Sequence, residues 1–170
     1  VQKALVASAL SADTIQFVDD PDRARVLDLL KLHEYVDIII PRGGAQLHQF
    51  CRANSQIPVI TGGLGICHLF VDQSADLDAS LPVIHNAKTQ RPSVCNALDV
   101  VLAHRAVAAA FLPRVVDALG KDGVTFRADP SAIPFLGDPL PASVQPAGPD
   151  DFDTEWVSLV LSLKVVDGLD

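Results

Sequence analysis

Lysine and arginine are scarce in this sequence of 170 residues, which has 13 basic and 21 acidic side chains and a formal net charge of −8. Nucleic acids are bound through clustered Lys and Arg side chains, and no such cluster occurs here, so the composition argues against a nucleic-acid-binding surface. No apolar run approaches the roughly 20 residues that a membrane-spanning helix needs. The N-terminus also has no basic segment followed by an apolar stretch and a cleavage site. We therefore expect a globular cytoplasmic protein without nucleic-acid or membrane partners.

Cysteine is infrequent and methionine is absent. The three cysteines, Cys51, Cys67 and Cys95, lie 16 and 28 residues apart, which excludes a CxxC pair and a complete set of cysteine ligands for zinc. Histidines are spread along the chain without metal-ligand spacing, at positions that include His48, His68, His85 and His104. The sequence therefore predicts no metal site. Because it lacks methionine and opens within an apparent helix at 1–10, we expect it to be an internal piece of a longer protein.

Runs rich in β-branched residues alternate with segments of helical spacing along the whole chain. Strands are expected at 14–18, 36–40, 57–60, 66–71, 98–103, 124–127 and 157–166. Helices are expected at 1–10, 21–31, 45–53, 75–87 and 106–119. The proline-rich segment 130–149 should be irregular. Strands separated by helices predict an α/β fold with a parallel sheet and crossover helices.

A single cysteine occupies a polar loop between an expected helix and an expected strand. The segment 86–96 reads NAKTQRPSVCN and contains Cys95. Loops of such scaffolds commonly carry function, and a nucleophilic thiol needs partial exposure and neighbours that favour its thiolate. Lys88 and Arg91 are candidates for those neighbours. A free cysteine is, however, more often a small buried apolar residue, so the residues alone leave both interpretations open.

Two long strings are specific enough to indicate a family. They are AKTQRPSVCN at 87–96 and PRGGAQLHQFCRANSQIPVITGGLGICHLFVDQSADLD at 41–78. Both resemble segments of the γ-glutamyl phosphate reductases, or glutamate-5-semialdehyde dehydrogenases, of the aldehyde dehydrogenase superfamily. The resemblance is nearly continuous from Asp19 to Ala128 and resumes at 151–166, whereas 132–150 matches nothing in the family. One departure precedes the cysteine, where the family more usually has Thr than Val94.

The resemblance implies a fold and a domain division. Family members have a three-layer α/β/α architecture with a Rossmann-like cofactor domain and a catalytic domain. Residues 1–62 would be the C-terminal part of the NADPH-binding domain, and 63–170 would be an incomplete catalytic domain. Superfamily members commonly pair through the catalytic domain, so a homo-oligomer is expected, and glutamate 5-kinase is a possible partner.

The resemblance also implies a reaction. Cys95 would attack L-glutamyl 5-phosphate and release phosphate, giving a thioester that NADPH reduces to glutamate 5-semialdehyde in proline biosynthesis. The backbone N–H of Cys95 is the expected oxyanion donor within this chain. Arg91 and Asn96, on the two sides of the cysteine, are the expected substrate-binding residues.

Five further residues are expected to bind the cofactor. They are Arg42, Gly43, Gly62, Gly63 and Glu155. The first two lie in a strand-to-helix turn where backbone N–H groups can meet a phosphate, although a tight turn alone would explain the glycine. Gly62 and Gly63 suit a hinge or a close approach to the nicotinamide. Glu155 resembles the carboxylate that holds the nicotinamide ribose, and its alternative interpretation is a solvated residue at a strand edge.

Ile60 supports the phosphate-dependent branch of the superfamily. Hydrolytic aldehyde dehydrogenases have a general-base Glu about 35 residues before the cysteine, and Ile60 occupies that place, 35 residues before Cys95. A base that activates water would hydrolyse the thioester before phosphate could react. Two alternatives stay open: another thioester-forming reductase, and a non-catalytic assembly module that retains the fold.

Overall fold

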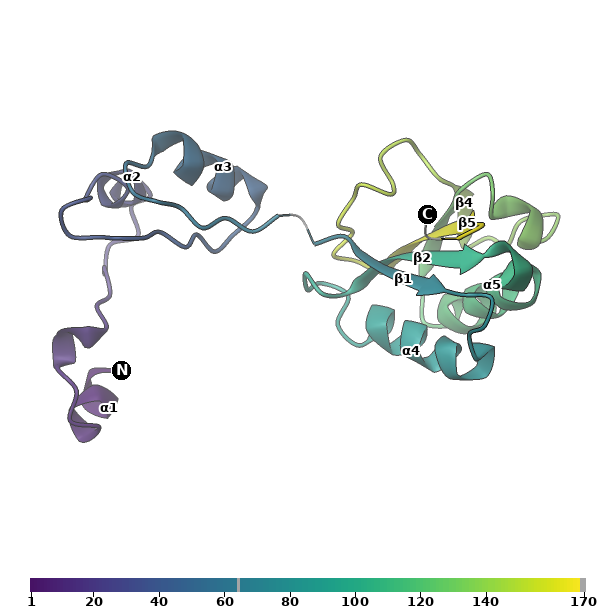
Figure 1. The fold of residues 1–170 in the computed structure, drawn as a ribbon, viewed down its shortest axis with the longest axis horizontal. Coiled ribbons are helices and arrows are strands. Elements are labelled where there is room, and N and C mark those ends of the chain that lie inside the picture. The colour runs from purple at the N-terminus through teal and green to yellow at the C-terminus, as the bar shows by residue number, and fades with distance from the viewer. Residues whose placement is uncertain (64, 169–170) are drawn as a thin grey trace. The chain divides into compact units, whose positions relative to one another are not determined.

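The computed structural model describes residues 1–63 and 65–168 (Figure 1). The chain divides into two compact units, Val1–Gly63 and Leu64–Asp170. The expected catalytic range 63–170 includes Leu64, Leu169 and Asp170, which lie outside the described residues. None of the described helices is long and apolar enough to cross a membrane.

The regular elements of the first unit are short helices joined by irregular chain. Its elements are α1 (Gln2–Ala7), the 3-10 helix η1 (Ala12–Thr14), α2 (Ala24–Leu29) and α3 (Ala45–Asn54). The strand expected at 14–18 is wrong, because η1 is capped by the Ser11 side chain and the following Phe17 and Val18 are 86% and 65% exposed, without a partner strand among the described residues. The strands expected at 36–40 and 57–60 are reduced to one parallel bridge between Ile39 and Val59.

Few apolar side chains are buried in the first unit. Its buried hydrophobic residues are Leu5, Leu30, Cys51 and Ile57. Many large apolar side chains are exposed instead, among them Val6, Leu10, Ile15, Phe17, Val18, Leu32, Tyr35, Ile38, Ile40, Phe50 and Ile60. Since hydrophobic stabilisation scales with the apolar area removed from water, this unit gains little of it from its own residues.

The second unit is built on a five-stranded sheet. Its strands are β1 (Cys67–Val71), β2 (Leu98–His104), β3 (Thr125–Ala128), β4 (Val144–Pro146) and β5 (Val160–Val166). Their order is β1-β2-β5-β3-β4, and every neighbouring pair is parallel. The predicted parallel sheet is therefore confirmed in this unit, together with the strands expected near 66–71, 98–103, 124–127 and 157–166.

Strand β4 lies in the proline-rich segment that was expected to be irregular, so that expectation is wrong for Val144–Pro146. Its pairing with β3 is continued by a backbone hydrogen bond at each end: Phe126 N–H donates to Ser143 O at 2.8 Å, and Ala147 N–H donates to Ala128 O at 2.8 Å. A proline fits here because β4 is an edge strand, where an N–H facing away from the sheet is not needed.

Two long helices cover one face of this sheet. Helices α4 (Leu77–Thr89) and α5 (Arg105–Gly120) pack against each other, α4 against β1 and β2, and α5 against β2 and β5 (Figure 1). The core between the layers includes fully buried side chains of Phe111, Leu112, Val115, Leu119, Val101, Phe126, Leu161 and Leu163. Each such Phe, Leu or Val contributes about 1.5–3 kcal/mol by its burial, so this layer stabilises the unit.

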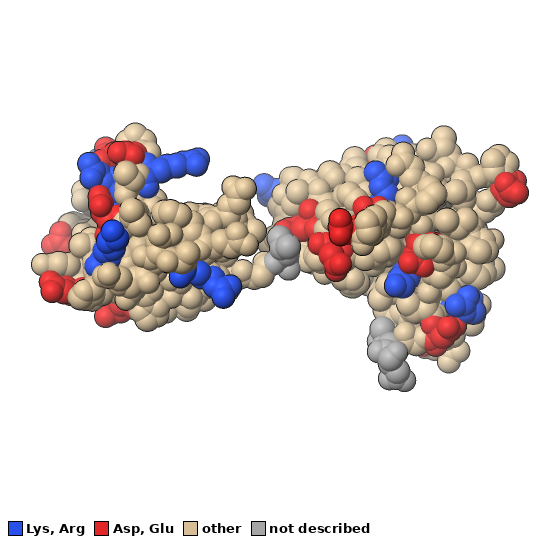
Figure 2. Space-filling view, turned by 90° about the horizontal axis from the view of Figure 1, so that it is seen from above, with Lys and Arg blue, Asp and Glu red and all other residues tan. Residues whose placement is uncertain are grey.

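Charged residues at the surface contribute much less than the core to the stability of the second unit. The basic side chains of the second unit are scattered among acidic ones on the face shown in Figure 2. Arg114 pairs with Asp78 at 2.6 Å and Lys121 with Asp117 at 2.7 Å, and all four side chains are exposed. Exposed pairs of this kind are typically worth about 0–1 kcal/mol.

Helix α4 starts at a side-chain cap. Asp76 Oδ1 accepts hydrogen bonds from the N–H groups of Asp78 and Ala79, both at 3.0 Å. These N–H groups have no partner within the helix, and the carboxylate also interacts favourably with the helix dipole. Because α4 ends where the Cys95 loop begins, this cap fixes the element that leads into the loop.

Replacing Asp76 by alanine should lower the free energy of unfolding by about 1 kcal/mol, because it removes the cap. The matched control is Asp117→Ala, which removes only the exposed pair with Lys121 and should cost less than about 0.5 kcal/mol. Urea denaturation followed by circular dichroism checks both values. Equal losses in the two variants would contradict the capping role.

Candidate active site

Cys95 lies in a turn between α4 and β2. The turn is closed by a hydrogen bond from Ala97 N–H to Val94 O at 3.0 Å, and the side chains of Cys95, Asn96 and Arg91 are exposed. Because all five strands are parallel, the residue that precedes β2 lies at the edge of the sheet where the strands begin. The thiol is therefore open to a ligand at the amino-terminal edge of the sheet.

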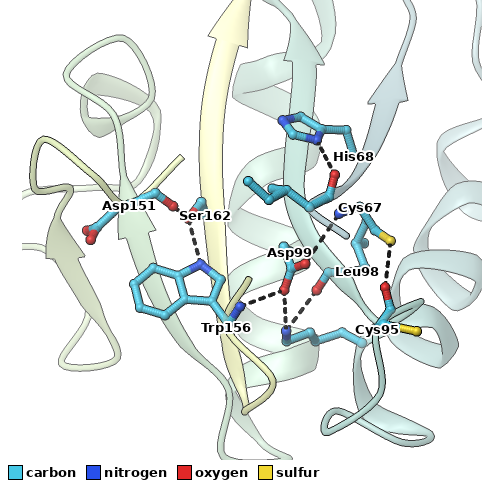
Figure 3. Close-up of polar contacts among 10 residues, drawn as sticks. Cys67, His68, Cys95, Leu98, Asp99, Asp151, Trp156 and Ser162 are labelled. Atoms are coloured by element: carbon cyan, nitrogen blue, oxygen red, sulfur yellow. Dashed lines mark hydrogen bonds and ion pairs between the residues drawn. The ribbon is translucent and has the colours of Figure 1, made fainter. Parts of the chain in front are cut away.

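The chain that enters β1 lies directly against this turn. A Cβ atom on Gly65 would be 2.7 Å from the carbonyl oxygen of Cys95 and 3.7 Å from its Cβ, so only glycine fits without a shift. Two residues later, Cys67 Sγ donates a hydrogen bond to the same carbonyl oxygen at 3.4 Å (Figure 3). These contacts fix the backbone of the cysteine turn from one side.

Lys88 holds the turn from the other side. Its side chain is fully buried, and Nζ donates to Leu98 O at 2.8 Å and lies 3.8 Å from Asp99 Oδ1 (Figure 3). The sequence suggested that Lys88 would be a neighbour of the thiol, whereas the structure buries its ammonium under the start of β2. Burial lowers the pKa of Lys88, and the negative charge of Asp99 opposes that shift.

Asp99 was not singled out from the sequence, yet it contacts three segments of the chain. The side chain is 2% exposed. Besides Lys88, its carboxylate accepts hydrogen bonds from Cys67 N–H at 3.3 Å and from Trp156 N–H at 3.2 Å (Figure 3). The signal that could have found it is a lone acidic residue in the otherwise apolar run LDVVLA at 98–103, because a buried carboxylate needs a specific set of donors.

Glu155 immediately precedes Trp156, on the segment that leads to β5, and is partly buried. Trp156 Nε1 donates to Ser162 Oγ at 3.1 Å, and the Arg127 guanidinium lies 5.6 Å from the centre of the indole ring. Ser162 Oγ in turn donates to Asp151 O at 2.9 Å. The backbone beside Glu155 is therefore fastened to the sheet at several points.

The Cys67 thiol lies next to the Cys95 turn, to whose carbonyl oxygen it donates a hydrogen bond. Burial raises the pKa of the Cys67 thiol, and the charges of Asp99, Cys95 and Glu155 raise it further, in that order. The link between Glu155 and this region that the structure shows is the N–H of its neighbour Trp156, which donates to Asp99 at 3.2 Å.

The other expected cofactor residues belong to the first unit. Arg42 and Gly43 are exposed, and Gly44 is the residue before α3, where it provides no side-chain cap. Gly62 O accepts a hydrogen bond from His48 Nδ1 at 3.2 Å, and Gly63 is exposed.

A cleft of about 820 Å³ opens at the start of α3, lined by Arg23, Val26, Gly44, Ala45, Gln46, Leu47 and Phe50. Within the described residues, no three acidic, His or Cys side chains are grouped as metal ligands.

The chain can be compared with known proteins. No family model matches it. The γ-glutamyl phosphate reductase of Roseiflexus castenholzii is 55% identical to it over 173 residues, a match that covers all of this chain. The chain is homologous to a segment of γ-glutamyl phosphate reductase. It spans 39–41% of the length of this relative and of two others that carry the same name, from Aeromonas salmonicida and Pasteurella multocida.

Solved structures agree with this assignment. The crystal structure of γ-glutamyl phosphate reductase from Thermotoga maritima is 42% identical, with a TM-score of 0.85, and the match covers 98% of this chain and 39% of that one. An acetylating aldehyde dehydrogenase from Geobacillus thermoglucosidasius has a TM-score of 0.69 at 20% identity, covering 98% of this chain and 43% of its own. The second match shows the fold alone, which is that of the aldehyde dehydrogenases, as expected from the sequence.

Thiol labelling should follow the order Cys95, Cys67, Cys51. Alkylation needs an accessible thiolate; Cys95 is exposed, Cys67 is partly buried with a raised pKa, and Cys51 is 2% exposed. Because its pKa is raised, Cys67 in the folded chain should become reactive at higher pH than in the unfolded chain. Iodoacetamide treatment with peptide mass spectrometry measures all three rates, and faster labelling of Cys67 than of Cys95 near neutral pH would contradict the structure.

Gly65→Ala should destabilise the second unit by about 1–3 kcal/mol, because its new Cβ would overlap the Cys95 carbonyl and force a backbone shift. The control is Gly63→Ala, since no described atom lies within 4 Å of a Cβ placed there, and it should change stability by less than about 0.5 kcal/mol. Urea denaturation monitored by the single tryptophan, which lies in the second unit, gives both values. A neutral Gly65→Ala variant would show that the turn is not held by this contact.

Proposed function

We propose that this chain carries the nucleophile and part of the cofactor site of a γ-glutamyl phosphate reductase. The reaction is the NADPH-dependent reduction of L-glutamyl 5-phosphate to L-glutamate 5-semialdehyde and phosphate, a step of proline biosynthesis. The observation that carries the proposal is the exposed Cys95 thiol in a turn that Gly65, Cys67 and Lys88 hold from two sides. The homology, which extends over the whole chain, supports it.

In the proposed mechanism, the Cys95 thiolate attacks the acyl carbon of the substrate. The new C–S bond forms as the bond from carbon to the phosphate oxygen breaks, so phosphate leaves and a thioester remains on Cys95. The backbone N–H of Cys95 would donate a hydrogen bond to the oxyanion as it forms. Arg91 and Asn96, exposed beside Cys95, suit the carboxylate and amino groups of the glutamyl substrate, because a guanidinium can bind a carboxylate through two hydrogen bonds.

The chain has groups that fit a nicotinamide dinucleotide. Gly44 leaves the first N–H groups of α3 without a side-chain cap, and the first residues of this helix line the cleft of the first unit. Uncapped N–H groups at a helix start bind phosphate, and Arg42 and Gly43 lie just before them. Glu155 would accept hydrogen bonds from the ribose hydroxyls, while Gly62 and Gly63 would leave room for the nicotinamide. When bound, NADPH supplies the hydride that reduces the thioester.

In this proposal the first unit is the end of the cofactor domain and the second is part of the catalytic domain. Ile60, an apolar residue that is 55% exposed, takes the place of the general base of hydrolytic relatives. Without a carboxylate there, water is not activated, and the thioester is left for hydride in one direction and for phosphate in the other.

The experiment is to join the chain to the flanking parts of the Roseiflexus castenholzii relative and to measure NADP⁺ reduction with glutamate 5-semialdehyde. Activity should require phosphate, because phosphate must resolve the thioester in this direction. Cys95→Ala should lower kcat by more than about 1,000-fold, as removal of a covalent nucleophile does. Cys51→Ala, in the other unit, is the matched control and should retain activity.

Two results would overturn the proposal. Activity without phosphate would indicate a hydrolytic enzyme or one that uses another acyl acceptor. Activity that survives Cys95→Ala would show that the nucleophile lies elsewhere.

A further inference from the structure

We propose that Asp99 is a positioning residue that holds the Cys95 turn and the Glu155 segment in a fixed relation, so that the nucleophile and the ribose-binding carboxylate are placed by one buried side chain. The roles of Cys95 and Glu155 in this inference rest on the proposed function. The contacts of Asp99 are those of the structure itself.

The Asp99 carboxylate receives donors from three separate segments. Oδ2 accepts from Cys67 N–H at 3.3 Å, Oδ1 accepts from Trp156 N–H at 3.2 Å, and Oδ1 lies 3.8 Å from Lys88 Nζ. The three segments are the start of β1, the chain that leads to β5 and the last turn of α4 (Figure 3). A side chain that is 2% exposed therefore joins parts of the sequence up to 89 residues apart, from Cys67 to Trp156.

Two of these segments lead to Cys95. The thiol of Cys67, whose N–H binds Asp99, donates to the Cys95 carbonyl oxygen at 3.4 Å. Lys88 lies one residue before the end of α4 and donates to Leu98 O at 2.8 Å, which ties together the two ends of the loop that contains Cys95. Displacing Asp99 would remove the partner that positions both Cys67 and Lys88, and these two residues make the contacts with the loop.

The third segment carries Glu155. Trp156 N–H is the backbone group directly after Glu155, so its hydrogen bond to Asp99 fixes the peptide unit that joins the two residues. The indole of Trp156 is held separately, by Ser162 and Arg127. The Asp99 contact thus sets the position of the Glu155 backbone relative to the start of β2.

The chemistry of these contacts requires a carboxylate. Two oxygens accept from two N–H groups, and the negative charge compensates the buried Lys88 ammonium. An asparagine has one acceptor oxygen and one donor NH₂ group, so it would leave one backbone N–H facing another donor. Asp99→Asn should therefore loosen either the Cys67 or the Trp156 segment while leaving Cys95 and Glu155 themselves intact.

The test uses the joined chain described above and two readouts that do not depend on each other. The first is the burst of phosphate released when an acyl phosphate acylates Cys95 without cofactor. The second is the KM for NADPH at saturating acyl phosphate. Asp99→Asn should slow the burst and raise the KM together, each by about tenfold to 100-fold, because a displacement of about 1 Å in an oriented site has effects of that size.

Asp129→Asn is the matched control. Asp129 is also a carboxylate of the sheet: it accepts hydrogen bonds from the N–H and Oγ of Ser131, and Lys164 Nζ lies 4.0 Å away. Unlike Asp99, it follows β3 and therefore lies at the edge where the strands end. Asp129→Asn should change neither readout.

Asp99→Glu, which keeps both acceptors, should recover part of each loss. If Asp99→Asn does not fold, the double variant Lys88→Met, Asp99→Asn removes the unpaired buried charge. It should show both losses relative to the single variant Lys88→Met, which lacks only the lysine contacts.

The inference would be overturned if a folded Asp99→Asn variant kept the phosphate burst and the KM for NADPH unchanged. Losses no larger than those of Asp129→Asn would overturn it as well. Failure of the proposed function is distinguished by the unmodified joined chain, which would then show no phosphate burst. In that case hydrogen exchange on the 170-residue chain still decides the matter. Asp99→Asn should speed exchange at the Cys67 or Trp156 amide by at least about tenfold, and unchanged exchange at both would reject the positioning role.

Discussion

The candidate site of the second unit depends on one buried carboxylate, that of Asp99. Placing a charge in the interior is costly unless it is paired and hydrogen-bonded, and Asp99 obtains this from Lys88 and from two backbone N–H groups. Leaving one member of a buried pair without its partner costs about 3–5 kcal/mol, which is a large part of the 5–15 kcal/mol that typically stabilises a domain. The segments that carry Cys95 and Glu155 are therefore held by an interaction whose loss would cost a large part of the free energy of unfolding.

The sequence predicts the elements of the second unit well because each one carries its own signal. Strands β2 and β5 are long apolar runs, α4 begins at the Asp76 cap, and α5 has helical spacing over its whole length. Strand β4 was missed because its prolines indicate irregular chain, and only its pairing with β3 makes it a strand. The first unit was predicted less well. A strand there needs a neighbour, and the run around Phe17 has none among the described residues, so its β-branched composition alone does not produce a strand.

The candidate site, too, contains residues that the sequence indicates and residues that it does not. The sequence could single out Cys95 as a candidate because an entire string of family-like residues surrounds it, and in the structure this cysteine is exposed. Asp99 and the contact of Cys67 with the cysteine turn could not be predicted. The Cys67 contact joins residues that are 28 apart in the sequence, and the two N–H groups that bind Asp99 are 32 and 57 residues away from it; no local pattern encodes such separations. For Lys88 the local pattern misleads. A lysine near a cysteine in sequence suggests a charge that activates the thiol, whereas the ammonium of Lys88 is buried and compensates Asp99.

The position of the site in the sheet follows from the strand order. In open α/β sheets, ligands usually bind outside the carboxyl ends of the strands. Here Gly65, Cys95 and Glu155 all precede their strands, so they lie at the amino-terminal edge. This is possible because β1, β2 and β5 are neighbours in the sheet although β5 is the last strand in sequence. Three entering segments thereby converge at one edge, and a single acceptor on the middle strand, Asp99 of β2, can reach the backbone of both outer ones. The insertion of β5 beside β2 is thus the topological feature that allows one carboxylate to bind the backbone of two entering segments, those of the proposed nucleophile Cys95 and the proposed ribose ligand Glu155.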